Sequence, residues 1–147
     1  MLRQAGPLDG KVLIDCTNPM EPPFENLKTG TGPSAARRAA DASGARVVKA
    51  FNLCHESVWR MTPPVFGGRP LGVPLCGDDA AALATVRGLV ADLGCEPMDG
   101  GGLDRAGLLE ATTAFLVGLW VAGEDPSRMV PPPAHAGDGS EPQVTSG

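Results

Sequence analysis

The segment KVLIDCTNP, residues 11–19, constrains the fold of this chain more than any other feature. Its apolar core follows Asp9-Gly10 and stops abruptly at the polar turn Thr17-Asn18-Pro19. Short apolar runs bounded by turn residues are typical of buried strands in sheets that are covered on both faces. Ligands of such α/β sheets sit beyond the carboxyl ends of the strands, so this turn marks an expected ligand site.

Strand-like and helix-like segments alternate after this first strand. Further strands are expected at 45–52, 72–76 and 95–99, and helices at 35–42, 80–93 and 104–121. This alternation predicts parallel strands joined by crossovers, hence an open α/β sheet, with Pro74 placing its strand at an edge or a bulge. The second strand ends in Phe51-Asn52, so that turn and Thr17-Asn18-Pro19 are expected at the same edge of the sheet.

The two longest predicted helices differ in character. The helix at 80–93 begins after Asp78 and Asp79, either of which can cap its first turn, and its apolar residues recur at helical spacing. The helix at 104–121 is apolar on nearly all sides from Ala114 onward. That composition predicts a helix that is deeply packed or lies at a subunit interface.

The size and charge of the chain limit its class. Its 147 residues fit one domain, predicted at 1–123, followed by a tail at 124–147 that is expected to be disordered. A net charge of −5 argues against nucleic-acid and anionic-membrane surfaces, which need clustered Lys and Arg. The first ten residues lack the apolar core of a signal peptide, and the apolar stretch 111–123 is too short to cross a bilayer. We therefore expect a cytoplasmic protein.

The sequence contains no recognisable catalytic or metal-binding pattern. Gly100-Gly101-Gly102 comes nearest to a dinucleotide loop, but Arg105 stands where the pattern needs Gly or Ala, so a structural turn is expected. The four cysteines have no CxxC spacing and indicate neither a disulfide framework nor zinc. A thiol enzyme that uses Cys54 and His55 stays open as an alternative.

Glu110 is a single carboxylate on the largely apolar final helix. Charged side chains are almost never fully buried unless they are paired. We expect a satisfied, partly buried carboxylate whose partner is Arg105, Arg37 or Arg38.

Several segments, in order, resemble one family. They are KVLIDCTNP, ARVVKAFN, GVPLCGDDAAALATVRGLVADLGCEPMDGGGL and LLE, and they span residues 8–119. The pattern is similar to the carboxy-terminal half of the NADP oxidoreductases that depend on the deazaflavin coenzyme factor 420, and of related NADPH-binding reductases. The sequence departs from the family at Gly102, Gly107 and Leu53, where Pro, Arg and Thr are common.

The resemblance implies a partial Rossmann-like open parallel sheet and hydride transfer between NADPH and a second redox partner, a deazaflavin in the best-known members. Such a reaction depends mainly on positioning and requires no acid, base or metal of the protein. By position in the family pattern, Thr17, Asn18 and Pro19 line the nicotinamide side. Ala50, Phe51 and Asn52 line the adjoining floor of the pocket. The same six residues also suit a purely structural role as strand-end turns.

The family's glycine loop belongs to an amino-terminal half that has no counterpart in the matched segments. We therefore expect a truncated domain that is of enzyme ancestry but is doubtful as an enzyme alone. A first strand without its usual neighbour exposes unpaired backbone groups. The alternative function is a non-catalytic half-domain that forms a homodimer, or binds a complementary chain, through this open sheet edge.

Overall fold

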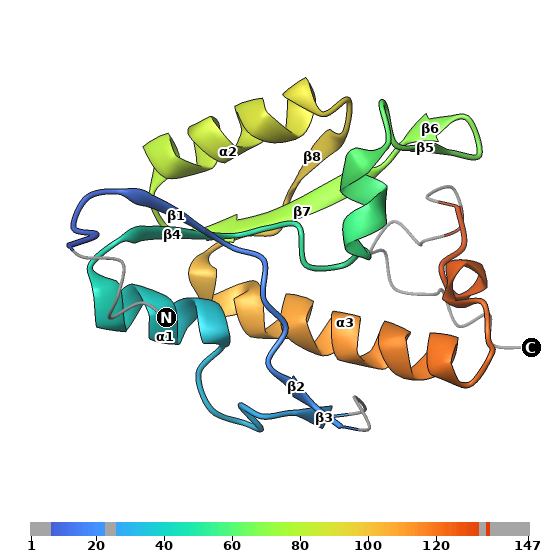
Figure 1. Ribbon diagram of the computed structural model, residues 1–147, viewed down its shortest axis with the longest axis horizontal. Helices are drawn as coiled ribbons and strands as arrows, with labels where there is room; N and C mark the ends of the chain where they lie inside the picture. The colour runs from blue at the N-terminus through green and yellow to red at the C-terminus, as the bar shows by residue number, and fades with distance from the viewer. Residues whose placement is uncertain (1–6, 23–25, 133–134, 136–147) are drawn as a thin grey trace, which may run out of the picture.

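The chain folds around a four-stranded sheet that is covered by helices on both faces (Figure 1). The computed structural model describes residues 7–22, 26–132 and 135. The strands lie in the order β1-β4-β7-β8, which are Val12–Asp15, Arg46–Lys49, Gly72–Gly77 and Glu96–Asp99. Helix α2 (Ala80–Asp92) covers one face, and α1 (Ala35–Ser43) and α3 (Ala106–Val121) cover the other. The predicted Rossmann-like α/β class is thereby confirmed.

Short elements fill the connections. Two hairpins pair β2 (Met20–Glu21) with β3 (Asn26–Leu27) and β5 (Val65–Phe66) with β6 (Arg69–Pro70). The 3-10 helices are η2 (Glu56–Arg60), η3 (Leu103–Arg105) and η4 (Pro126–Met129). Helix η4 packs near the end of α3 with Pro126 buried, a regular structure that the prediction of a disordered 124–147 tail did not anticipate. Residues 133–134 and 136–147 of that tail lie outside the described residues.

The sheet is mixed, and this corrects the expectation of uniformly parallel strands. β1 runs parallel to β4 and β7 runs parallel to β8, but β4 and β7 are antiparallel. Between these two strands lie only η2 and the β5–β6 hairpin. A parallel pair needs a long crossover, usually a helix, which this segment does not provide. The carboxyl ends of β1 and β4 still share one edge of the sheet.

Pro74 lies in an interior strand, not at the edge or bulge that its presence predicted. β7 pairs with β4 only at Cys76 and Gly77, so β4 forms no ladder opposite Pro74. The carbonyls of Leu71 and Leu75 point toward β8, where they accept hydrogen bonds from the Glu96 and Gly100 amides. Alternate residues of a strand direct their backbone groups to opposite sides, so Pro74 faces the unpaired side. Its missing N–H therefore costs no ladder hydrogen bond.

The helix starts are set by side-chain caps. Ser34 Oγ accepts from the Arg37 amide at 3.1 Å and begins α1. Of the two candidates for the α2 cap, Asp79 is the one used, because its Oδ1 accepts from the Ala82 amide at 2.7 Å. Asp78 instead accepts from the Leu103 amide at 2.7 Å and ties the start of α2 to η3. Each cap satisfies an amide that has no partner inside its own helix.

Two apolar cores lie on opposite faces of the sheet. On the α2 face, Val48, Ala50, Val73 and Leu75 pack against Ala82, Val86 and Val90. On the other face, Val47 and Cys76 pack with Ala36, Leu103 and Ala106. The neighbouring residues Val47 and Val48 point to opposite faces of the sheet, and both are buried because helices cover both faces.

Helix α3 is only half covered. Its inward side is buried at Ala106, Glu110, Thr113 and Ala114, whereas Leu108 and Phe115 are 61% and 60% exposed. No residue of α3 after Ala114 is buried, so the predicted deep packing of this apolar part is wrong, and a subunit interface there stays a prediction. Among the described residues, no helix is long and apolar enough to span a bilayer.

Candidate functional site

The turns that follow β1 and β4 are joined by a reciprocal amide pair. Asn18 Nδ2 donates to the carbonyl of Asn52 at 2.8 Å, and Asn52 Nδ2 donates to Asn18 Oδ1 at 3.0 Å. The two turns therefore lie at the same edge of the sheet, as the sequence predicts. This edge is where ligands of open α/β sheets bind.

Helix α3 supports the second turn from behind. Asn52 Nδ2 also donates to Thr113 Oγ1 at 2.9 Å, and the Thr113 hydroxyl in turn donates to the Leu109 carbonyl at 3.1 Å. Asn52 is 4% exposed. Its side chain is thus a fixed brace between the two strand ends and α3.

The six predicted site residues divide by exposure. Thr17 is exposed, and Asn18, Pro19 and Phe51 are half-buried, so these four face the surface at the strand ends. Ala50 is fully buried against the α2 core, and Asn52 is buried as a brace. These last two support the surface from below and present almost none of their side chains to a ligand. Binding by all six stays a prediction.

A buried ion cluster lies directly under the first turn, and the sequence analysis missed two of its three members. Lys49 Nζ contacts Asp15 Oδ2 at 3.0 Å and Glu110 Oε1 at 2.9 Å, and it donates to the Thr17 carbonyl. Lys49 and Glu110 are fully buried and Asp15 is 7% exposed. A lysine inside the apolar run VVKAF was the available signal, since buried lysines are rare unless they are paired.

Glu110 joins the cluster to α1. Its Oε2 accepts from the Ala35 amide at 3.1 Å and its Oε1 is 3.4 Å from the Ala36 amide, at the start of that helix. The positive end of the helix dipole stabilises a carboxylate at this place. The expected partners Arg105, Arg37 and Arg38 are wrong, and the carboxylate is fully buried instead of partly buried. Sequence distance hid the true partner, Lys49 on β4.

The cluster also shapes the first turn. Asp15 Oδ1 accepts from the Thr17 amide at 2.9 Å and from the Thr17 hydroxyl at 2.7 Å. Its other carboxylate oxygen binds Lys49. Thr17 is therefore held by its amide, its hydroxyl and its carbonyl, although its side chain is at the surface.

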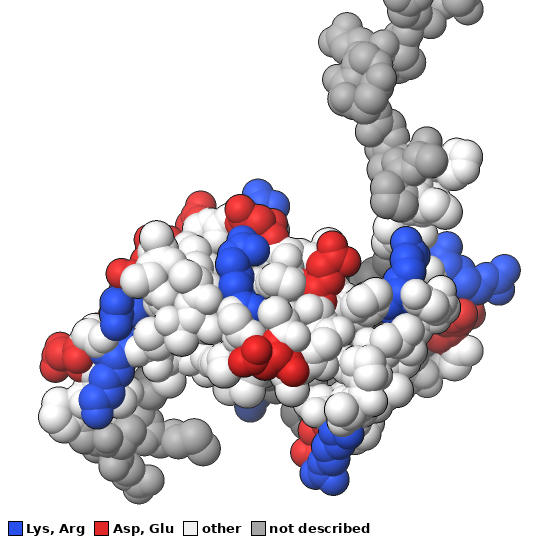
Figure 2. Space-filling view, turned by 90° about the horizontal axis from the view of Figure 1, so that it is seen from above, with Lys and Arg blue, Asp and Glu red and all other residues white. Residues whose placement is uncertain are grey.

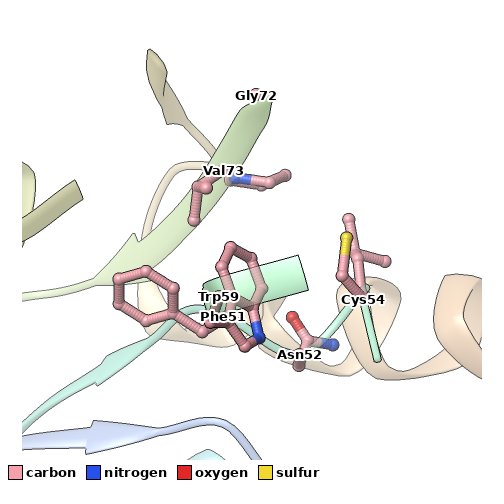
Figure 3. A pocket seen from close by; sticks show the side chains of 8 residues that line it. Phe51, Asn52, Cys54, Trp59, Gly72 and Val73 are labelled. Atoms are coloured by element: carbon pink, nitrogen blue, oxygen red, sulfur yellow. The ribbon is translucent and has the colours of Figure 1, made fainter. Parts of the chain in front are cut away.

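Beyond the second turn, Phe51 and Trp59 form an aromatic corner (Figure 3). Their rings meet edge to face with centroids 5.1 Å apart. Phe51 has a φ of 61°, which is unusual for a residue other than glycine and is typical of constrained functional segments. The cavity beside them has a volume of about 10 Å³, with Asn52, Cys54 and Val73 also in its wall. A space of this size holds about one water molecule.

The Gly100-Gly101-Gly102 segment is a turn between β8 and η3. Gly101 has a φ of 87°, its amide donates to Asp99 Oδ1, and Arg105 Nε donates to the Gly100 carbonyl at 2.8 Å. Next to it, a groove of about 210 Å³ is lined by Pro74, Cys76, Gly100, Arg105, Leu108, Leu109 and Thr112. Arg105 is thus occupied by the turn, in agreement with the structural role that was predicted.

Surface charge gives no sign of a phosphate-binding face on the side that Figure 2 shows. Acidic and basic side chains are interspersed there and form no large patch of one sign. Hydrogen bonds from the Leu103 amide, and then from Arg37, hold the pKa of Asp78 below its usual range. That carboxylate joins the start of α2 to η3 and to α1.

The thiol alternative finds no support in the geometry. Burial raises the pKa of the Cys54 thiol, which disfavours the reactive thiolate. His55 Nδ1 lies 3.0 Å from Ser57 Oγ and accepts from the Ser57 amide, so it caps η2. Within the described ranges, no three potential metal ligands come together.

Comparison with known proteins finds one curated relative and several solved structures that are similar to this chain. No family model matches the chain. It is 35% identical over 117 residues to the metalloreductase STEAP3 of Rattus norvegicus, a match that covers 79% of this chain and 22% of that protein. A solved structure of a protein assigned as an F420-dependent NADP reductase, from Arthrobacter sp. FB24, aligns over 80% of this chain with a TM-score of 0.70 and 29% identity. The family resemblance is confirmed.

A second solved structure, the hypothetical protein SMa0349 of Sinorhizobium meliloti, aligns over 72% of this chain with a TM-score of 0.64 and 27% identity. The chain spans 55% and 52% of these two solved chains. It is thus similar in sequence and fold to a structure assigned as an NADP reductase, over about half the length of that solved chain.

Proposed function

We propose that the protein carrying this chain is an NADP(H)-linked oxidoreductase that transfers hydride between NADPH and a deazaflavin-like or other redox partner. The observation that carries the proposal is the reciprocal Asn18–Asn52 pair, which joins two strand-end turns into one surface at the edge of the sheet. The similarity to an NADP reductase in sequence and fold supports it. A cytoplasmic location belongs to the same proposal.

The residues of the two strand-end turns suit the nicotinamide end of NADPH. When bound, NADPH supplies the hydride, and the protein has to hold two flat rings in contact and keep water away. Thr17, Asn18 and Pro19 form a turn fixed from beneath by the ion cluster, so a ring placed on it would not shift. Phe51 and Trp59 give an apolar wall on the adjoining side.

The same residues do not suit the phosphate end. A dinucleotide loop needs a glycine fingerprint between a strand and a helix. In the described part of the chain, Gly100-Gly101-Gly102 is flanked by Asp99 and Asp104, whose charges would repel a pyrophosphate. We propose that the pyrophosphate is held by groups other than the described residues.

A blocking substitution tests this function. Thr17→Trp places a large side chain on the exposed turn, and Thr85→Trp makes the same change on the exposed side of α2. In the protein that carries this chain, with its pyrophosphate-binding groups, we expect saturable NADPH binding and acceptor-dependent NADPH oxidation for the wild type and for Thr85→Trp, with at least a tenfold loss of affinity in Thr17→Trp. Absence of saturable NADPH binding in the wild type would overturn the proposal.

A second function is favoured by the open edge of β1. In the described part of the sheet, β1 pairs with β4 alone. Because the Lys11 and Asp15 carbonyls accept from β4, the backbone groups of Val12 and Ile14 point to the open side. An apolar edge strand of this kind is a template for another strand. We propose that it pairs with a second copy or with a complementary chain.

Removal of one edge amide tests the second function. Val12→Pro deletes an N–H that faces the open side, while Val12→Thr keeps it with a side chain of similar shape. If the edge pairs two copies, sedimentation should show a dimer for the wild type and Val12→Thr and a monomer for Val12→Pro. A wild type that is monomeric and captures no complementary chain would contradict this function.

A further inference from the structure

The ammonium group of Lys49 has all of its hydrogen-bonding capacity in use. It carries three protons, and three acceptors surround it: Asp15 Oδ2, Glu110 Oε1 and the Thr17 carbonyl. The side chain is fully buried. A lysine with no spare proton or lone pair, and no access to solvent, does not act on a substrate, so its effect must pass through the groups that it holds.

The Thr17 carbonyl is the one held group that belongs to the exposed turn. The Thr17–Asn18 peptide is trans, and in a planar trans peptide the C=O and the N–H point in opposite directions. Because the carbonyl points inward to Lys49, the Asn18 amide points outward from the sheet edge. No acceptor among the described residues bonds this amide, although the Asn18 side chain and carbonyl are both engaged.

We propose that Lys49 is a positioning residue, which turns the Thr17–Asn18 peptide so that the Asn18 N–H becomes a hydrogen-bond donor to the ligand. The inference rests on the proposed function for the identity of that ligand. The matching group is a carbonyl oxygen on a flat ring, and in NADP this is the carboxamide oxygen of the nicotinamide. The donor would fix which face of the ring lies against the turn.

The ion cluster explains why a lysine serves here better than an apolar residue. An apolar side chain of similar length would leave the Thr17 carbonyl without a donor, and the peptide would be free to rotate toward water. Asp15 fixes the other side of the same residue through the Thr17 amide and hydroxyl. Together the two groups leave the peptide one orientation.

Amide-resolved NMR of the protein that carries this chain tests the inference, with NADP⁺ as the probe, because we propose that groups beyond the described residues hold the pyrophosphate. In the wild type without ligand, the Asn18 amide should exchange rapidly with solvent while the Thr17 amide is protected. On addition of NADP⁺, the Asn18 amide should shift downfield and become protected. Slow exchange of the Asn18 amide in the ligand-free wild type would overturn the inference, and this observation needs no variant to fold.

Matched variants separate the positioning role from a general structural one. Lys49→Met should abolish the Asn18 response and weaken NADP⁺ binding about tenfold, the equivalent of one hydrogen bond. Lys11→Met makes the same change at an exposed lysine beside β1 and should alter neither. Binding that shifts other residues but leaves Asn18 unchanged would overturn this inference alone. No response at any residue would overturn the proposed function as well.

Discussion

The two halves of the sheet are held together by different forces. Under β1 and β4, a buried lysine and two carboxylates connect both strands to α1, α3 and the first turn. Around β7 and β8, aliphatic side chains such as Val73 and Leu75 pack against α2, and the ion pair Arg87–Asp99 is exposed at 3.9 Å. Only the first half carries the proposed site.

This difference indicates that the buried charges serve geometry more than stability. Apolar residues can replace a buried ion pair with little or no loss of stability, so stability alone does not require the cluster. Apolar packing is non-directional, whereas each contact of Lys49 fixes the direction of one group. The half with β1 and β4 has to hold the first turn in one orientation, and its buried ion pairs provide that orientation. The half with β7 and β8 only has to bury apolar side chains, for which aliphatic packing is enough.

Loss of the cluster's cation should have the largest effect. Lys49→Met leaves Asp15 and Glu110 buried without their counter-ion, and we expect a loss of about 3–5 kcal/mol in the free energy of unfolding. Urea denaturation measures it. The matched change Lys11→Met, at an exposed site, should stay within about 0.5 kcal/mol. Equal effects of the two substitutions would remove the contrast between the halves.

A cavity in the apolar half should rank second and should leave the turn intact. Leu75 is fully buried, so Leu75→Ala should cost about 3 kcal/mol. Leu108→Ala, at a residue that is 61% exposed, is the control and should cost far less. Hydrogen exchange of the Thr17 amide should stay slow in Leu75→Ala and quicken in Lys49→Met. Faster exchange of this amide in both variants would show that the two halves are not independent.

The brace between the turns should have an intermediate effect. Asn52→Ala removes the bonds to Asn18 and Thr113 and leaves polar groups without partners, at a cost of about 1–2 kcal/mol. Asn26→Ala, at an exposed position on β3, should be nearly neutral. Thermal unfolding of the two variants makes the comparison. A neutral Asn52→Ala would show that the turns do not depend on this brace.

The exposed carboxylate Asp78 should have the smallest effect. Its pKa is lowered in the folded chain, so its contribution to stability is present above the ordinary value of 3.8 and is lost as the pH falls through the lower, folded value. Asp78→Asn should therefore narrow the stability difference between neutral and acidic solution slightly. Urea midpoints measured from pH 5 to pH 2 test the sign. A larger loss of stability on acidification in Asp78→Asn than in the wild type would contradict this prediction.

Local signals were enough to predict most elements of the fold. The cap Asp79 directly precedes α2, and its predicted start at residue 80 matches Ala80–Asp92. Of the apolar stripe that predicted this helix, Val86 and Val90 are buried, whereas Leu89 and Leu93 are exposed. The antiparallel β4–β7 contact was missed because strand direction depends on what connects the strands. The signal was present in the Pro- and Gly-rich segment 62–70, which cannot form a crossover helix.

The site was predictable only in outline. The polar turns at Thr17-Asn18-Pro19 and Phe51-Asn52 could be placed at one edge, because the carboxyl ends of parallel neighbours meet there. The ion cluster could not, since Lys49 and Glu110 are 61 residues apart and meet only after α3 packs on the sheet. Pairings between distant charges depend on tertiary packing, which no local pattern records.

A crystal structure of the protein with NADP⁺ would show where the nicotinamide ring binds. We expect the nicotinamide ring to lie against the Thr17-Asn18-Pro19 turn, with its carboxamide oxygen accepting from the Asn18 amide and Phe51 at its side. A nicotinamide ring bound elsewhere, such as in the groove beside Arg105 and Leu108, would contradict it.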